Sequence, residues 1–60
     1  MTPSQFTEAR NTLGLTVTAM AEVLGMNRRT VQRMERGDLP VTERTRKYVE
    51  LLLAHSNEGK

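Results

Sequence analysis

Apolar residues recur along the chain at the three- and four-residue spacing of amphipathic helices. Gly14, Gly25 and Gly37 interrupt this pattern at positions that suit helix ends. We therefore expect a compact all-α fold of four helices, or five, covering about residues 3–13, 17–24, 28–36 and 43–55. The first three segments have these apolar positions for a core: Phe6, Ala9, Leu13, Val17, Met20, Ala21, Leu24, Val31 and Met34.

Residues typical of helix N-termini stand directly before these segments. Thr2 with Gln5 three positions later is a capping-box pattern, and Pro3 between them suits the first helical position. Thr16, Asn27 and Thr42 each precede a later segment and are expected N-caps.

The third segment carries a concentrated positive charge. At about 100° per residue, Gln32 and four arginines fall within an arc of roughly 140°, and Val31 and Met34 point the other way. Like charges this close repel one another, so we expect a polyanion to cover them. A solvated basic face is the alternative. The arginines are Arg28, Arg29, Arg33 and Arg36.

Two features of the first three segments concern packing. About three residues link the second segment to the third, which favours the steep crossing of a helix-turn-helix over an antiparallel hairpin. Arg10 falls on the apolar stripe of the first segment, where an unpaired charge would be costly, so it needs a carboxylate partner.

The apolar residues of the fourth segment cover a wider arc of the helix than one core face requires. Its apolar side chains spread over roughly 200°, and we expect a second copy of the chain to cover part of them. The residues concerned are Tyr48, Val49, Leu51, Leu52 and Leu53. Residues 1–55 are thus one expected domain, and residues 56–60 an expected polar tail without structure.

Composition narrows the class of protein. Sixty residues form one small domain at most, which buries only about 60% of its unfolded surface, so a partner subunit is expected. The net charge is +2 with a calculated pI of 9.7. With no cysteine, no apolar run long enough for a bilayer and no secretion signal, we expect a cytoplasmic protein.

Several motifs resemble the Cro/C1-type helix-turn-helix proteins, the lambda repressor-like family of phages and bacteria. They are Leu13-Gly14-Leu15-Thr16, residues 20–27 (MAEVLGMN), Thr30-Val31 and Met34-Glu35-Arg36-Gly37. The resemblance is in register over about residues 6–37, and residues 40–53 look like the family's next helix. It implies that Glu35 is the partner of Arg10. Val17 departs from the pattern, because many relatives carry a glutamine there that contacts the DNA backbone.

The resemblance also implies which side chains contact DNA. Positions matching Arg28, Arg29 and Arg33 reach base edges in the major groove, and the arginine fork suits guanine, so each operator half-site should contain G·C pairs. Gln32 either reads adenine or contacts the backbone. Expected phosphate contacts are Thr16, Asn27, Thr30, Arg36 and Arg44. Arg44, Arg46 and Lys47 either extend the phosphate contact or form a solvated helix face.

The expected function is a sequence-specific regulator of transcription that binds double-stranded DNA. By resemblance it would be a homodimeric repressor or autorepressor, bound to an inverted repeat in a bacterial or phage-infected cell and associated with the nucleoid. The alternative is an antitoxin or other protein-interaction module that uses the fourth helix. We expect no enzyme activity, since His55 is the only histidine, and no cofactor, metal or small-molecule ligand. The single Tyr and single Phe sit at core positions, which disfavours stacking on RNA.

Overall fold

The computed structural model describes residues 1–58 of the protein. Within that range the chain forms four α-helices and no strand, which confirms the all-α prediction. The helices are α1 (Pro3–Leu13), α2 (Val17–Leu24), α3 (Arg28–Arg36) and α4 (Glu43–Glu58). None of the helices described here is both long and apolar enough to cross a membrane.

Each helix begins at the capping residue that the sequence predicts. The Thr2 hydroxyl accepts a hydrogen bond from the Gln5 amide at 3.1 Å, and the Gln5 side chain accepts one from the Thr2 amide at 2.9 Å. Thr16 and Asn27 accept from amides in the first turns of α2 and α3, and Thr42 accepts from Thr45. Local sequence therefore sets where all four helices start.

One apolar cluster holds the four helices together. It contains Phe6 and Ala9 of α1, Met20 and Ala21 of α2, Val31 and Met34 of α3, and Val49 of α4. The predicted core positions Leu13, Val17 and Leu24 are partly buried and pack against this cluster. Because α3 is only nine residues long, these contacts rather than its own propensity stabilise it.

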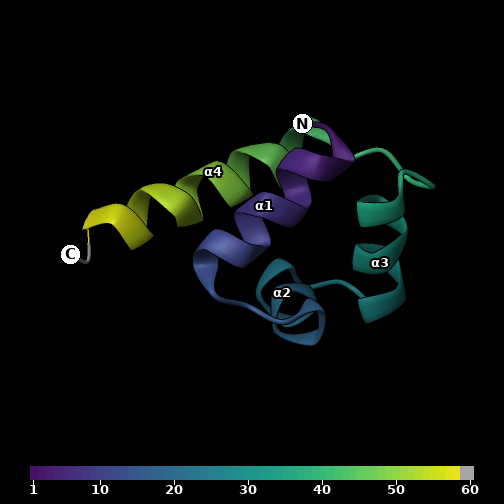
Figure 1. Cartoon of the computed structure of the whole chain (residues 1–60), viewed down its shortest axis with the longest axis horizontal. Helices are drawn as coiled ribbons and strands as arrows, with labels where there is room; N and C mark the ends of the chain where they lie inside the picture. Colours follow the sequence, from purple (N-terminus) through teal and green to yellow (C-terminus); the bar gives the residue numbers. More distant parts are fainter. Residues whose placement is uncertain (59–60) are drawn as a thin grey trace.

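The link between α2 and α3 is short and its backbone is fixed. Gly25 adopts the left-handed conformation, with φ 69°, which a residue with a Cβ would enter only with strain. The Met26 amide then donates to the Ala21 carbonyl at 2.9 Å. The chain can thus leave α2 and enter α3 within three residues. Helix α3 lies crosswise to α4 at one end of the molecule (Figure 1).

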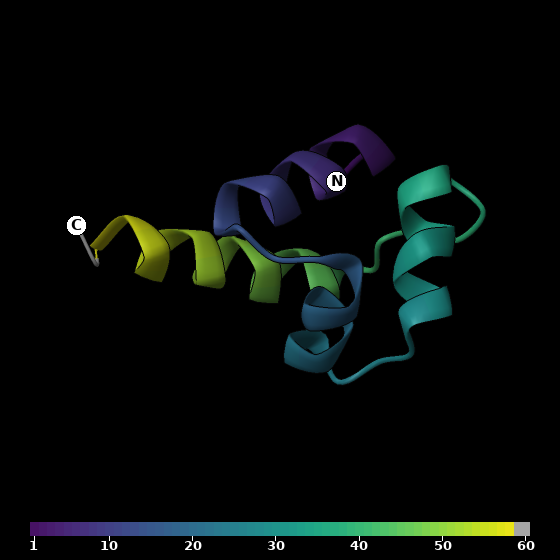
Figure 2. The same cartoon turned by 60° about the horizontal axis from the view of Figure 1, so that its bottom comes forward.

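Helix α4 extends away from α3, and its C-terminal half runs past the end of α1 (Figures 1 and 2). It continues to Glu58, so the predicted end at His55 was three residues too early. Residues 56–58 of the expected tail are helical, and residues 59–60 lie outside the described residues. Polar residues carry no apolar periodicity, which is why the pattern missed this last turn.

Candidate nucleic-acid interface

The surface of α3 that faces away from the core is polar and exposed. Asn27 caps the helix, and Val31 and Met34 anchor its inner side in the core. With the inner side fixed, the helical repeat directs four long polar side chains outward: Arg28, Arg29, Gln32 and Arg33, all exposed. Together with Asn27 and Thr30 they line a shallow hollow, which we call the α3 face.

Among the described residues, no acidic side chain neutralises the positive charge of the α3 face. In the part of the chain that the structure describes, no hydrogen bond or ion pair engages the side chains of Arg28, Arg29 or Arg33. The first turn of α3 also contains no acidic residue. Three guanidinium groups on one short helix therefore keep their full charge and their hydrogen-bond donors available to an external anion.

Arg36 belongs to the same helix but has a different environment. Its Nη2 lies 3.3 Å from Oδ2 of Asp38, the residue after the glycine that ends α3. Both side chains are largely exposed, at 68% and 54%. The apolar pattern of the sequence does not indicate this pair, because Asp38 lies beyond the end of α3.

The helix N-caps keep donors that can still point outward. The Thr16 Oγ1 and the Asn27 Oδ1 accept bonds from the Ala19 and Arg29 amides at 3.1 and 2.8 Å. Each cap therefore uses an acceptor, which leaves the threonine hydroxyl proton and the asparagine NH₂ group for another partner. Thr30 is half-buried beside them, and Arg44 is exposed on α4.

Arg10 and Glu35 are in contact, as the sequence and the resemblance lead one to expect. The Arg10 Nε lies 2.7 Å from Glu35 Oε2, and Nη2 lies 3.4 Å from Oε1. Only 17% and 14% of the two side chains is exposed. Arg10 Nη1 also donates to the Leu15 carbonyl at 2.9 Å, a contact that sequence analysis missed. One side chain thus ties α1, the link before α2 and the end of α3 together.

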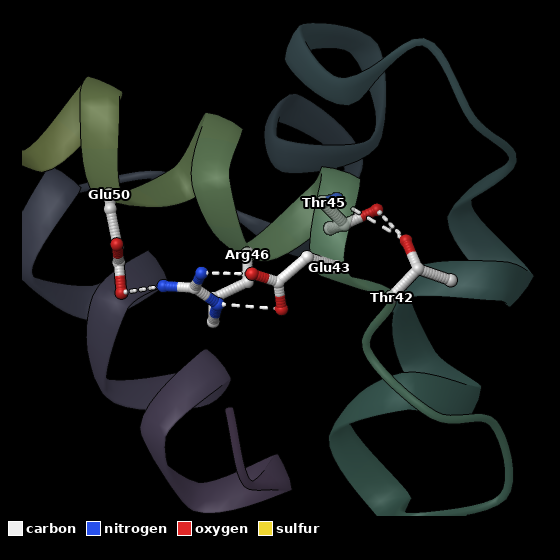
Figure 3. Close-up of polar contacts among 5 residues, drawn as sticks. All are labelled: Thr42, Glu43, Thr45, Arg46 and Glu50. Atoms are coloured by element: carbon white, nitrogen blue, oxygen red, sulfur yellow. Dashed lines mark hydrogen bonds and ion pairs between the residues drawn. The ribbon is translucent and has the colours of Figure 1, made fainter.

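Arg46 lies between two carboxylates on α4 (Figure 3). Its Nη1 is 2.8 Å from Glu50 Oε2, and it makes a two-point contact with Glu43. The hydrogen bonds to Glu43 and Glu50 raise the pKa of Arg46 above its ordinary value. The same bonds from Arg46 lower the pKa of Glu43 below its ordinary value. Of the two alternatives for Arg46, this environment favours the helix face over the phosphate contact.

The apolar side chains of α4 divide between core and surface. Val49 is fully buried, and Leu53 packs partly buried against the core cluster. Tyr48 and Leu51 remain 40% and 53% exposed, so the prediction of a core position was correct for Phe6 and wrong for Tyr48, and Leu52 is half-buried. The large apolar side chains that α4 leaves at the surface are therefore Tyr48, Leu51 and, in part, Leu52.

The geometry of the α3 face suits the binding of an anion. The α3 face presents hydrogen-bond donors and positive charge, which suit an anionic ligand with oxygen acceptors. Among residues 1–58, no three His, Cys, Asp or Glu side chains gather as a metal site would require.

Comparison with known proteins agrees with this geometry. The family model described as a helix-turn-helix domain matches residues 4–56, from the first turn of α1 to near the end of α4. The match also agrees with the resemblance found in the motifs. No curated protein and no solved structure matches the chain.

Proposed function

The chain belongs to the helix-turn-helix domain family, and from that premise we propose that it is a regulator of transcription that binds a specific double-stranded DNA sequence through α3. The observation that carries the proposal is the α3 face itself. It places three arginines, which have no ion-pair partner among residues 1–58, on the exposed side of a helix whose other side is anchored in the core. A helix of that kind fits the major groove of B-DNA.

The α3 arginines would read bases. An arginine fork can donate two hydrogen bonds to guanine O6 and N7, and each good pair discriminates by about 1–3 kcal/mol. Arg28, Arg29 and Arg33 would contact base edges, so we expect G·C pairs in each half-site. Gln32 would read adenine or contact the backbone.

Phosphate contacts would fix the position of α3 in the groove. The free donors of Thr16 and Asn27 lie at two helix N-termini, where the helix dipole also favours an anion. Thr30, Arg36 and Arg44 would complete the set. Such contacts set register and orientation, and they carry no sequence information directly.

Two copies would bind together. Symmetric dimers of helix-turn-helix domains place two recognition helices in successive major grooves, about 34 Å apart. The exposed apolar surface of Tyr48, Leu51 and Leu52 would form the contact between copies. These residues lie around the middle of α4 (Glu43–Glu58), a helix that extends away from α3 (Figure 1). Repression would follow from occupying a promoter.

The direct test is selection of binding sites from random duplex DNA. We expect an inverted repeat with G·C pairs at the same positions in both half-sites, bound with a steep salt dependence because phosphate contacts release counterions. A selected pool with no common sequence, bound by charge alone, would contradict sequence-specific recognition.

Oligomeric state tests the dimer separately. Leu51→Lys places a charge at the centre of the proposed contact, so sedimentation should show a monomer and operator affinity should fall. Val23→Lys is the matched control, since Val23 is also exposed, at 38%, but lies on α2. A wild-type protein that is monomeric both free and on its operator would rule out the α4 dimer.

The same α4 surface supports the second candidate, a protein-interaction module such as an antitoxin. Its exposed tyrosine and leucine are residues that interfaces bury. A chain that forms a stoichiometric complex with another protein, and binds none of the selected duplexes, would favour this function over the first.

A further inference from the structure

The pair between Arg36 and Asp38 places a carboxylate at the C-terminal end of the α3 face. The position of Asp38 is fixed by its backbone, because its amide donates to the Arg33 carbonyl at 2.8 Å directly after the left-handed Gly37. In the described part of the chain, Asp38 is the only acidic residue paired with an arginine of the outward-facing arc of α3.

Folding gives little reason for a carboxylate at this place. A negative charge at the C-terminus of a helix meets the unfavourable end of its dipole. An ion pair whose two side chains are mostly exposed contributes little to stability. The Arg10–Glu35 pair, by contrast, is shielded and joins three segments of the fold.

We propose that Asp38 is an internal competitor for DNA phosphate. A carboxylate and a phosphate offer the same kind of oxygen acceptor to a guanidinium group, so Asp38 competes with a phosphate for Arg36 and offsets part of its positive charge. With Arg36 on a phosphate, the Asp38 carboxylate also lies near the DNA backbone and repels it. This inference rests on the proposed function and adds the statement that Asp38 limits sequence-independent binding.

For DNA recognition, the arginines of α3 would then differ in how strongly they bind the duplex. Arg28, Arg29 and Arg33 meet the duplex without an internal competitor, whereas the contact of Arg36 with phosphate is offset by Asp38. Because phosphate contacts supply almost all non-specific affinity, weakening one of them lowers binding to every sequence. Base discrimination by the other arginines is unaffected.

The test compares Asp38→Asn with Glu43→Gln. Each substitution removes one carboxylate that pairs with an arginine, so net charge changes equally, but Glu43 lies on α4. Affinity of the full chain for a selected operator and for a scrambled duplex is measured by fluorescence anisotropy over a series of KCl concentrations. Thermal melting of each variant is followed in parallel.

We expect Asp38→Asn to tighten binding to both duplexes by a similar factor, about threefold to tenfold at low salt, where charges within a Debye length interact most strongly. The slope of log affinity against log salt should steepen by about one, as for one added phosphate contact. Glu43→Gln should change affinity less than Asp38→Asn does, since Glu43 pairs with Arg46 of α4 and not with an arginine of α3. Arg36→Gln should weaken binding more in the Asp38→Asn background than in the wild type.

Three outcomes would overturn the inference. Asp38→Asn could leave affinity unchanged, could weaken it, or could raise it no more than Glu43→Gln does. A wild-type chain that binds no duplex would overturn the proposed function as well. The wild-type titration therefore separates failure of the proposed function from failure of this inference.

Discussion

The surface has a second hollow, between α1 and α4, besides the one that forms the α3 face. Both are lined by arginine, but only the α1–α4 hollow is lined by carboxylates as well. The α1–α4 hollow is lined by Glu8, Glu50 and Arg46, and Glu43 contacts Arg46 as well. The α3 face is lined by arginine, asparagine, threonine and glutamine, with no acidic residue among its lining. The number of positive charges therefore does not identify a binding surface. What distinguishes the α3 face is that Arg28, Arg29 and Arg33 have no ion-pair partner within the described chain.

Arg10→Met should produce the largest effect, because it removes the pair that holds the α3 face in place. Glu35 would keep a largely buried charge without its partner. We expect a loss of about 2–3 kcal/mol in the free energy of unfolding. For a domain of this size that lowers the melting temperature by about 10 °C or more, and DNA affinity should fall with it.

Thermal melting followed by circular dichroism measures this loss. Adding Glu35→Gln to Arg10→Met should cost less than it does in the wild type, because the two side chains act as a pair. An Arg10→Met variant that melts at the wild-type temperature would refute the structural role of the pair.

Arg29→Ala should come next and should act on binding rather than folding. Arg29 is exposed and has no ion pair among the described residues, so melting should stay near wild type. Loss of one bidentate contact with guanine should cost about 1–3 kcal/mol against the preferred base. Anisotropy with single-base variants of the operator would show the preference relaxing at one position.

Arg29→Lys is the matched control, because lysine keeps the charge and loses the fork. It should retain most of the salt dependence and lose the base preference. If Arg29→Ala weakens every operator variant equally, Arg29 contacts phosphate and not a base.

Arg46→Gln should have a smaller effect, and it should act on folding rather than on DNA binding. Removing Arg46 breaks its bonds to Glu43 and Glu50, so the melting temperature should fall by a few degrees while operator affinity stays within about twofold. Arg33→Gln makes the same change of charge on the α3 face, where it should weaken DNA binding and leave melting nearly unchanged. Equal loss of DNA affinity in the two variants would remove the distinction between the surfaces.

Acid titration of Glu43 should give the smallest effect. The bonds donated by Arg46 hold the pKa of Glu43 below its ordinary value of 4.5. Its contribution to stability is therefore present above pH 4.5 and is lost as the pH falls through the lower pKa of the folded state. The difference in melting between wild type and Glu43→Gln should be visible at pH 7 and should close in acid. A Glu43 carboxyl signal in NMR that titrates at or above 4.5 would contradict this.

Local features of the fold could be predicted because they depend on neighbouring residues. Caps such as Thr16 and Asn27 need only the amides of the next turn. The core followed from apolar spacing, since each short helix has one side to bury. The Arg10–Glu35 contact spans distant positions: the charge on an apolar stripe indicated only that Arg10 needs a carboxylate, and the family resemblance identified that carboxylate as Glu35.

Other features, namely the surface ion pairs and the bases that each arginine reads, do not follow from the apolar pattern. Glu43, Arg46 and Glu50 stand at the three- and four-residue spacing of helical ion pairs, a signal that was present but not used. The Arg36–Asp38 pair depends on the path of the chain after Gly37, which no periodicity reveals. The choice of base by each arginine depends on how α3 lies in a groove, so it stays a prediction.

NMR of the chain titrated with its selected operator tests the central claim most directly. If the unpaired arginines of α3 form the DNA surface, the largest shifts should fall on the amides of residues 27–33 and the start of α2, and on the side chains of Arg28, Arg29 and Arg33. Amides of residues 46–50 should change little beyond the effect of dimer formation. Shifts confined to α4, with the α3 arginines unperturbed, would contradict the account.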